Sequence, residues 1–326
     1  MKLPAAGVGA GVGAGVGAAI ADRKANPATG LRDKMKDNPQ FQDRMQDIKQ
    51  NGPGDKAGLK DRISQLPADR ERPNRGDVHD KIRDRGNDLR GHVNDRMHHR
   101  PFPGHLPHYP HHPHWGGGHG HWWRWASASA ITRWCVWGPR WGQPIYYDYG
   151  STIYYDTEYV YVNDEPYATT EQYAEQAMEL ADAGAQALAA APEVEETGTD
   201  ENWMSLGVFA LANSDQGDPI MYLQLAVDKQ GIIAGTYYNS ATETSLPITG
   251  KVDSETQRAA WTIGENKNTV METGVYNLTE EQTSVLVHFG KEKQQTWMMA
   301  RLDEEAEEGA AEPAPAVLPL PPAANP

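Results

Sequence analysis

Eight short runs of strand-forming residues lie between residues 203 and 302, and this spacing constrains the fold more than any other feature. The connections between the runs are short and rich in residues that favour turns. Even spacing with tight turns predicts an eight-stranded antiparallel up-and-down barrel, because closing the sheet removes its edges. A two-sheet sandwich is the alternative. The runs are Trp203–Leu211, Ile220–Asp228, Gly231–Tyr238, Leu246–Asp253, Gln257–Ile263, Val270–Leu278, Thr283–Phe289 and Gln295–Leu302.

Alternation of apolar residues within the first two runs predicts which face of each strand is buried. Successive side chains of a strand point to opposite faces of the sheet, so residues two apart share a face. We expect two sets of side chains to face the core: Met204, Leu206, Val208 and Ala210 in the first run, and Met221, Leu223, Leu225 and Val227 in the second.

The charged residues divide the chain near residue 150. Residues 1–150 contain 23 Lys and Arg against 15 Asp and Glu, a net charge of +8. Residues 151–326 contain 7 against 30, a net charge of −23. Residues 22–121 are poor in apolar residues and cannot offset the entropy of ordering their backbone. An acidic folded domain with a basic arm is typical of binding and structural proteins.

The first 21 residues leave two interpretations open. Ala19-Ile20-Ala21 resembles the small-residue cleavage site of a secretory signal peptide. The preceding segment, however, alternates Gly with Ala or Val from Gly7 to Gly17 and is only weakly hydrophobic. A low-complexity segment at a truncated start is the other interpretation. Elsewhere no uncharged apolar run reaches the roughly 18 residues that a bilayer requires, so we expect no membrane-spanning helix.

A unit rich in Trp and Tyr precedes the strand-rich domain. We expect a short helix within Trp123–Trp137 and three very short strands at Ile145–Tyr147, Ile153–Tyr155 and Tyr159–Val162. A longer helix should begin at Thr169, whose capping partner is Gln172, and end before Pro192. Gly184 weakens this prediction, since glycine costs about 1 kcal/mol relative to Ala inside a helix.

These features together predict an all-β C-terminal domain, a small α+β aromatic module before it and a long disordered N-terminal region. The mixed charges of the N-terminal region, with many Asp-Arg pairs, predict at most transient helices. The predicted boundaries are 1–121 for the basic, His-rich disordered region, 122–191 for the aromatic module, 192–201 for an acidic linker, 202–304 for the β domain and 305–326 for a disordered Ala/Pro tail.

Several strings in residues 115–303 resemble a family of planctomycete proteins of unknown activity, labelled as cell-surface or mu-protocadherin-like proteins. The resemblance implies export and a cell-envelope or surface setting, with no known chemistry. Members usually begin with a signal peptide and a long Arg/Pro/Gly-rich region, whereas this chain begins with a short glycine-alternating segment. The strings are His121-Trp122-Trp123-Arg124-Trp125-Ala126, Tyr146-Tyr147-Asp148-Tyr149-Gly150, Tyr159-Val160-Tyr161-Val162-Asn163, Tyr173-Ala174-Glu175-Gln176-Ala177, Leu206-Gly207-Val208-Phe209-Ala210 and Gln257-Arg258-Ala259-Ala260-Trp261.

Ten of the twelve histidines lie between His92 and His121. Neutral imidazoles bind Zn²⁺, Cu²⁺ or Ni²⁺, and a flexible tract can gather several around one loosely held ion. The Gly and Pro content of this tract argues against a preorganised site, so a solvated linker whose charge changes near pH ~6.5 is the alternative. The candidate ligands are His98, His99, His108, His111, His112, His114, His119 and His121.

The aromatic cluster has two interpretations. Flat aromatic faces could stack on sugar rings, or the same rings could form the core of a module that has few aliphatic residues. We favour packing, with Arg124, Arg133 and Arg140 stacking on tryptophans. The candidate platform residues are Trp122, Trp123, Trp125, Tyr146, Tyr147, Tyr154 and Tyr155.

Catalytic signatures do not stand out in this sequence. There is no nucleophile elbow, zinc-protease helix, P-loop or EF-hand loop. The single cysteine, Cys135, excludes an intrachain disulfide and is expected to pack as a small hydrophobe. His288 alternates onto the strand face opposite Val287, and we expect a hydrogen-bonded surface residue there.

The sequence therefore predicts a non-enzymatic, exported structural or adhesion protein of the cell envelope or surface, without a cofactor. Its basic arm would bind an anionic envelope polymer or another surface protein, since counterion release rewards binding to any polyanion. Nucleic acid is not the expected partner, because Asp dilutes the basic residues and no nucleic-acid-binding module is recognisable. A small-ligand carrier, a metal-sequestering protein and a cytoplasmic location are the alternatives. The oligomeric state is left open.

Overall fold

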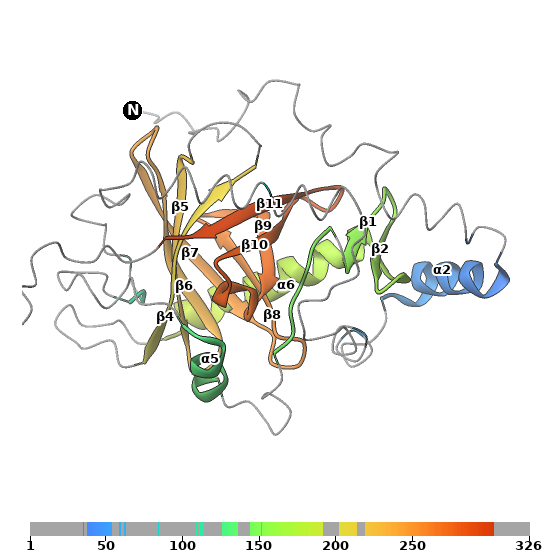
Figure 1. Cartoon of the computed structure of the whole chain (residues 1–326), viewed down its shortest axis with the longest axis horizontal. Helices are drawn as coiled ribbons and strands as arrows, with labels where there is room; N and C mark the ends of the chain where they lie inside the picture. The colour runs from blue at the N-terminus through green and yellow to red at the C-terminus, as the bar shows by residue number, and fades with distance from the viewer. Residues whose placement is uncertain are drawn as a thin grey trace, which may run out of the picture.

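The computed structural model contains an antiparallel barrel, a small tyrosine-rich sheet and a long helix that packs on both (Figure 1). The structure describes residues 35, 38–53, 59, 62, 84, 109, 111–113, 126–135, 144–150, 152–191, 202–213 and 219–302. The predicted acidic linker and Ala/Pro tail, and most of the predicted disordered region, lie outside these residues. No helix within the described ranges is both long and apolar enough to cross a membrane.

The C-terminal domain is a closed barrel of eight antiparallel strands, which confirms the barrel rather than the sandwich. Each strand pairs with the next along the chain, and β11 pairs back with β4 to close the ring. The order is therefore up-and-down, as the short connections predict. The strands are β4 (Trp203–Ala212), β5 (Met221–Asp228), β6 (Ile232–Asn239), β7 (Thr244–Val252), β8 (Arg258–Ile263), β9 (Asn266–Gly274), β10 (Gln282–Phe289) and β11 (Lys293–Arg301).

The predicted core face is correct for β5 and wrong for half of β4. Leu223, Leu225 and Val227 lie in the central core cluster. In β4 the register to β5 shifts between Ser205 and Gly207, where Gly207 has φ +130°. The extra residue of such a bulge reverses the alternation. Leu206 therefore joins the central core, whereas Val208 and Ala210 belong to a separate cluster with side chains of β5, β6 and β11.

The β9 strand begins and ends four residues before the predicted run. It spans Asn266–Gly274, and the predicted turn at Glu265 to Asn268 is mostly strand. A tight turn at Gly264, with φ +61°, permits this early start. After β9 the chain forms a 3-10 helix, η1 (Asn277–Thr279), in place of the predicted strand end.

The tyrosine sheet consists of β1 (Ile153–Tyr155), β2 (Tyr159–Val162) and β3 (Glu165–Thr169), paired antiparallel in that order. Two of its strands match the prediction. The third corrects it, because the expected strand at Ile145–Tyr147 has no strand pairing and residues 165–169 pair with β2 instead.

The α6 helix (Thr170–Ala189) contacts β7, β8 and β9 on the outside of the barrel and crosses behind them in Figure 1. Thr169 and Gln172 form the predicted capping box. Gly184 is required at the crossing, since a Cβ atom at this position would collide with the Gly250 carbonyl oxygen. The helix and β7 therefore approach backbone to backbone at this point.

Two further helices, α5 and α2, precede the tyrosine sheet in the chain. α5 (Ala128–Trp134) is shorter than the expected Trp123–Trp137 helix, begins with Ser127 as its N-cap and buries Ile131 in the barrel core. α2 (Pro39–Asn51) lies within the region predicted to be disordered, and the prediction is wrong for this stretch.

The α2 helix has the local signals that the mixed-charge composition obscured. Asn38 caps its N-terminus and accepts hydrogen bonds from Gln40 and Phe41, and Pro39 occupies the first turn. Phe41, Met45 and Ile48 recur at helical spacing and pack against tyrosines of β1 and β2. Tertiary burial of this one face explains why a short, charged helix is ordered.

Candidate functional site

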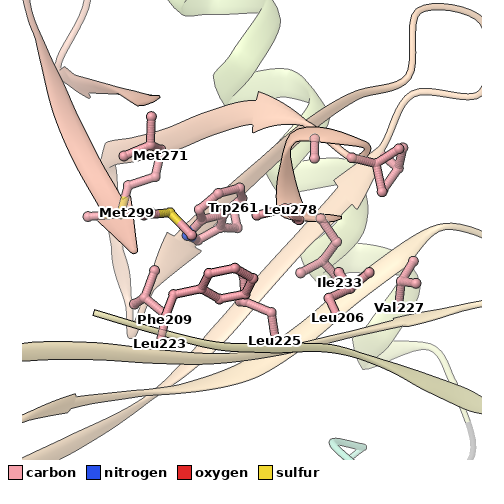
Figure 2. Packing of buried hydrophobic residues seen from close by; sticks show 14 of the residues in the cluster. Leu206, Phe209, Leu223, Leu225, Val227, Ile233, Trp261, Met271, Leu278 and Met299 are labelled. Atoms are coloured by element: carbon pink, nitrogen blue, oxygen red, sulfur yellow. The ribbon is translucent and has the colours of Figure 1, made fainter. Parts of the chain in front are cut away.

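The barrel interior is one candidate site, and large apolar side chains occupy it. Trp261, Phe209 and Met299 converge from β8, β4 and β11, and Ile233 and several leucines pack in the same cluster (Figure 2). Trp261 is fully buried, and its indole Nε1 has no hydrogen-bond partner within the described part of the chain. The described interior is therefore a packed core with one unpaired donor.

One end of the barrel is closed by polar and helical elements. Arg301 donates to the carbonyl oxygens of Leu278 and Thr279 in η1, and its guanidinium lies 5.5 Å from the centre of the Phe209 ring. Ile131 of α5 packs against the same core. At the opposite end, side chains such as Tyr237 and Trp297 are only partly buried. The barrel thus has one covered end and one apolar rim.

A buried polar network between the barrel and α6 is the second candidate site. Glu272 on β9 forms an ion pair with Arg258 on β8 and accepts a hydrogen bond at 3.0 Å from Nε2 of His288 on β10. The three side chains are 0%, 4% and 1% exposed, respectively. Three adjacent strands therefore place one carboxylate, one guanidinium and one imidazole in a single enclosed layer.

Arg258 also holds α6 to the barrel wall. It donates from Nη2 to the carbonyl oxygen of Tyr173 at 2.9 Å and from Nη1 to Gln176 Oε1 at 3.1 Å. Its guanidinium stacks on the Tyr173 ring, 3.9 Å from the ring centre. All three nitrogens of the guanidinium are therefore engaged, and none is directed at solvent.

The electrostatics of the network favour the charged forms of Glu272 and Arg258. Burial alone would raise the pKa of Glu272, but the charge of Arg258 and the hydrogen bond from His288 outweigh it and leave the pKa below its usual value. Burial likewise opposes charge on Arg258, and Glu272 reverses the effect so that the pKa is raised well above its usual value. An ionised Glu272 accepts from Nε2 of His288, and Nδ1 of this imidazole is buried without a partner in the described chain.

Tyrosine hydroxyls extend this network toward the tyrosine sheet. Tyr149 and Tyr173 place their hydroxyl oxygens 3.2 Å apart, and Tyr147 donates to the Thr256 carbonyl oxygen at 2.9 Å. Burial raises the pKa of all three phenols above its usual value. They are therefore neutral hydrogen-bonding groups in the folded protein.

The predicted aromatic platform is divided by the structure. Tyr147 and Tyr154 are buried, with exposures of 0% and 2%, and so present no face to a ligand. Tyr146 and Tyr155 are partly buried, against the barrel core and the tyrosine cluster respectively. The predicted Trp122, Trp123 and Trp125 lie outside the described residues. Tyr147 and Tyr154 therefore pack in the interior, and the use of the other aromatic residues as a platform stays a prediction.

The predicted metal ligands are mostly outside the described residues, including His98, His99, His108, His114, His119 and His121. His112 is buried, and its Nε2 lies 3.2 Å from the Ile248 carbonyl oxygen on β7. The neighbouring His111 leaves Nδ1 without a partner among described atoms. Within the described ranges, no three His, Cys, Asp or Glu side chains gather in a group that could hold a metal ion.

Two other sequence interpretations are tested directly. Cys135 is fully buried, as expected, and burial together with the charge of Asp228 raises the pKa of its thiol to about 12. His288 was expected at the surface and is instead buried against Glu272. The correction arises because α6 covers neighbouring β9 and places the Tyr173 ring 6.3 Å from the His288 ring, which the strand sequence alone does not reveal.

Sequence reasoning missed Glu272 and Arg258 as members of a site. They are 14 residues apart on neighbouring strands, and the antiparallel register of β8 and β9 brings them together. The available signal was the strand alternation. Arg258 is two residues from Ala260 and Glu272 is two residues from Val270, so each charged residue shares a strand face with an apolar residue that packs beneath α6. Charged residues on such a covered face are expected to pair.

The chain has no match among protein-family models, curated proteins or solved structures. The site must therefore be interpreted from its own geometry. An enclosed carboxylate whose partners are a guanidinium and an imidazole can fix the positions of strands and helix. Within the described part of the chain, these three side chains are almost completely enclosed.

Proposed function

We propose that this chain is a non-catalytic structural and binding protein of the cell envelope or surface. The observation that carries the proposal is the buried Arg258–Glu272–His288 layer, in which Arg258 joins α6 to the barrel while paired with Glu272. The carboxylate, imidazole and guanidinium could otherwise act as acid, base or anion-binding groups. Here they bind one another, and Arg258 also binds α6. The barrel is then a stable scaffold for contacts made elsewhere on the chain.

The filled barrel interior supports the same proposal. Trp261, Phe209 and Met299 occupy the volume in which an eight-stranded carrier barrel would hold its ligand. Packed interiors of this kind contribute stability, because they remove apolar area from water at about 25 cal/mol per Å². A rigid, stable domain suits a protein exposed to an extracellular environment.

Charge supports an anionic partner for the N-terminal half. The net charge of +8 on residues 1–150 favours association with a polyanion by releasing its counterions. The resemblance to planctomycete cell-surface proteins supports an exported setting for that contact. The acidic half, with a net charge of −23, would be repelled by the same polymer and so directed away from it.

Polyanion binding is tested on the full chain with heparin-agarose and, in solution, with poly-L-glutamate. We expect retention at low salt and complete elution before 1 M NaCl, where the screening length falls to about 3 Å. A neutral dextran resin is the matched control. Passage through heparin-agarose at low salt, or retention that persists at 1 M NaCl, would overturn the electrostatic mechanism.

The cellular setting is tested separately by fractionating cells and sequencing the N-terminus of the mature chain. Recovery in the envelope or medium, with residues removed before Asp22, supports export. Recovery in the cytosol with Met1 intact would remove the envelope setting and leave only the scaffold.

A small-ligand carrier is the second candidate, supported by the unpaired Trp261 indole inside the barrel. A buried N–H without a partner could donate to an acceptor group on an apolar ligand. Thermal unfolding in the presence of fatty acids, retinoids and aromatic alcohols separates the two functions. Stabilisation that saturates with ligand and is lost in Trp261→Phe favours the carrier, and an unchanged Tm favours the packed scaffold.

A further inference from the structure

Asn51 and Gly52 form the only Asn-Gly pair in the sequence, and they lie where α2 ends. Asn51 is exposed, and Gly52 adopts φ +92° with open space where a Cβ atom would stand. A glycine has no side chain to shield its backbone nitrogen, so this nitrogen can approach the side-chain carbonyl carbon of a preceding asparagine. The pair is therefore a candidate site of spontaneous deamidation.

This reaction consumes one water molecule and releases one ammonia molecule. The Gly52 nitrogen loses its proton to solvent hydroxide and forms a bond to Cγ of Asn51, and the Cγ–Nδ2 bond breaks as Nδ2 is protonated and leaves as ammonia. Water then opens the cyclic imide. Opening at Cγ gives aspartate, and opening at the backbone carbonyl carbon gives isoaspartate. Both products carry a carboxylate where the native side chain is neutral.

The docked position of α2 holds the attacking nitrogen in a hydrogen bond. The Gly52 N–H donates to the Ile48 carbonyl oxygen at 3.1 Å. The same oxygen accepts from Nε2 of Gln172 on α6 at 3.0 Å, so a neighbouring helix fixes the carbonyl that engages the nucleophile. The Ile48 side chain is buried among tyrosines of β1 and β2. Attack on Asn51 therefore requires the last turn of α2 to leave this position.

Contacts further along α2 hold the helix on the tyrosine sheet. Phe41 stacks on Tyr161, with ring centres 6.4 Å apart, and the Tyr159 hydroxyl donates to the Met45 carbonyl oxygen at 3.2 Å. These side chains form a cluster separate from the barrel core. Elements with few contacts to the rest of a fold open locally, well below the free energy of global unfolding. Opening of α2 thus leaves the barrel intact.

A carboxylate at position 51 opposes the docked helix. In the native chain, Nδ2 of Asn51 donates to Oδ1 of Asp47 at 2.6 Å. Deamidation removes this donor and places two negative charges four residues apart, which is unfavourable on a helix surface. The new charge also lies at the negative end of the helix dipole. In the isoaspartate product, the backbone between the Ile48 carbonyl and the Gly52 N–H is longer by one methylene group.

We propose that Asn51 is a deamidation site whose reaction is slowed by the docking of α2 and whose product releases α2 from the tyrosine sheet. The two effects reinforce each other, because opening permits the reaction and the reaction makes opening more frequent. The site acts as a slow, irreversible timer for the exposure of the tyrosines beneath α2. This inference is independent of the proposed polyanion binding.

The first test measures deamidation of the full-length chain by peptide mass spectrometry after incubation in mildly alkaline buffer. Phe41→Ala removes a stacked ring at the other end of α2, which weakens docking without changing the chemistry at the reacting pair. We expect Asn51 to deamidate about ten times faster in Phe41→Ala than in wild type, since reaction through an open state scales with its population. Gln46→Ala, on the exposed face of α2, is the matched control and should behave as wild type. Asn239, which precedes an exposed serine in the barrel, should react equally in all three chains.

The second test measures release of α2 by hydrogen exchange of the backbone amides of residues 41–45. Asn51→Asp reproduces the aspartate product, and we expect these amides to exchange about three times faster than in wild type. Asp47→Asn/Asn51→Asp removes the like-charge pair and should restore most of the protection. Equal deamidation of wild type and Phe41→Ala would overturn protection by docking. Equal exchange in wild type and Asn51→Asp would overturn the release of α2 by the product.

Discussion

The barrel interior and the layer beneath α6 are both fully buried, yet they are built from opposite chemistry. The interior is almost entirely apolar, and residues such as Trp261, Phe209 and Leu225 make nondirectional van der Waals contacts there (Figure 2). The layer beneath α6 contains an ion pair, an imidazole and several phenols joined by hydrogen bonds. Nonpolar packing supplies most of the stability of a fold, whereas directional polar contacts fix which surfaces meet.

The difference explains how two units become one body. Eight strands can close into a barrel through their own pairing and interior. A helix lying on the outside could slide along that surface if only small residues such as Ala260 supported it. Arg258 prevents sliding by binding one carbonyl oxygen and one side chain of α6. Substitutions in the barrel interior and in the layer beneath α6 should therefore differ in how much unfolding free energy is lost and in the physical cause of the loss.

The largest expected effect comes from neutralising the central carboxylate. Glu272→Gln leaves Arg258 as an unpaired buried charge, and we expect unfolding free energy to fall by about 3–5 kcal/mol. Urea denaturation followed by circular dichroism measures the loss. Arg258→Met/Glu272→Gln should be more stable than the single variant, because no buried charge is left unpaired.

The matched control for Glu272→Gln is an exposed ion pair between α6 and β9. Asp182 lies 2.5 Å from Lys267 at the surface, and Asp182→Asn should cost less than about 1 kcal/mol. Equal losses for Glu272→Gln and Asp182→Asn would show that burial of the polar layer does not matter.

Truncation in the barrel interior should be next in size. Leu225→Ala removes a fully buried side chain and leaves a cavity, which costs about 2–5 kcal/mol. Ile220→Ala, at a position 43% exposed, should stay within about 0.5 kcal/mol. A loss at Leu225 no greater than at Ile220 would contradict a packed interior.

The helix crossing should be sensitive to a single methyl group. Gly184→Ala forces α6 away from the Gly250 carbonyl, and we expect a loss of about 1–3 kcal/mol despite the better helix propensity of Ala. Ala185→Gly is the control, with a loss of about 1 kcal/mol from propensity alone. A stabilised Gly184→Ala would mean that the helix does not approach β7 so closely.

Acid should weaken the polar layer selectively. Because the folded state holds the pKa of Glu272 below its usual 4.5, this group contributes stability at higher pH that is lost as the pH falls through the folded value. The urea midpoint of wild type should decline below about pH 4.5. The decline should be shallower in Arg258→Met/Glu272→Gln, and identical acid profiles would contradict the assignment.

The smallest effect should be a gain in stability. Thr236 is fully buried, and its hydroxyl has no partner in the described chain, so Thr236→Val should raise the unfolding free energy by about 1 kcal/mol. Thr262→Val is the contrasting variant, because its hydroxyl lies 3.4 Å from that of Thr249. Thermal unfolding of both variants gives the comparison.

Local sequence patterns predicted most of the fold. Short turns and alternating residues placed all eight barrel strands, and the Thr169–Gln172 pair placed the start of α6. The errors have physical causes. The bulge before Gly207 reversed the faces of β4, because one additional residue changes the alternation without changing composition.

The candidate site could be predicted only in fragments. His288 was recognised as unusual, but its partner Glu272 is fixed by the register of β9 and β10, which a single sequence does not specify. Gly184 looked like a weakness of the helix until the crossing with Gly250 was visible. Contacts between distant segments decide both cases, and they also explain why α2 was missed.

The barrel is closed, whereas the described tyrosine sheet has two edge strands, β1 and β3, each paired only with β2. β3 pairs with β2 on one side only, and on its open side the Pro166 carbonyl is occupied by the guanidinium groups of Arg44 and Arg62. Removal of α2 would uncover the tyrosine face that Phe41, Met45 and Ile48 cover, formed by Tyr154, Tyr159 and Tyr161. Those few N-terminal contacts thus keep an aromatic surface from becoming a sticky patch open to neighbouring molecules.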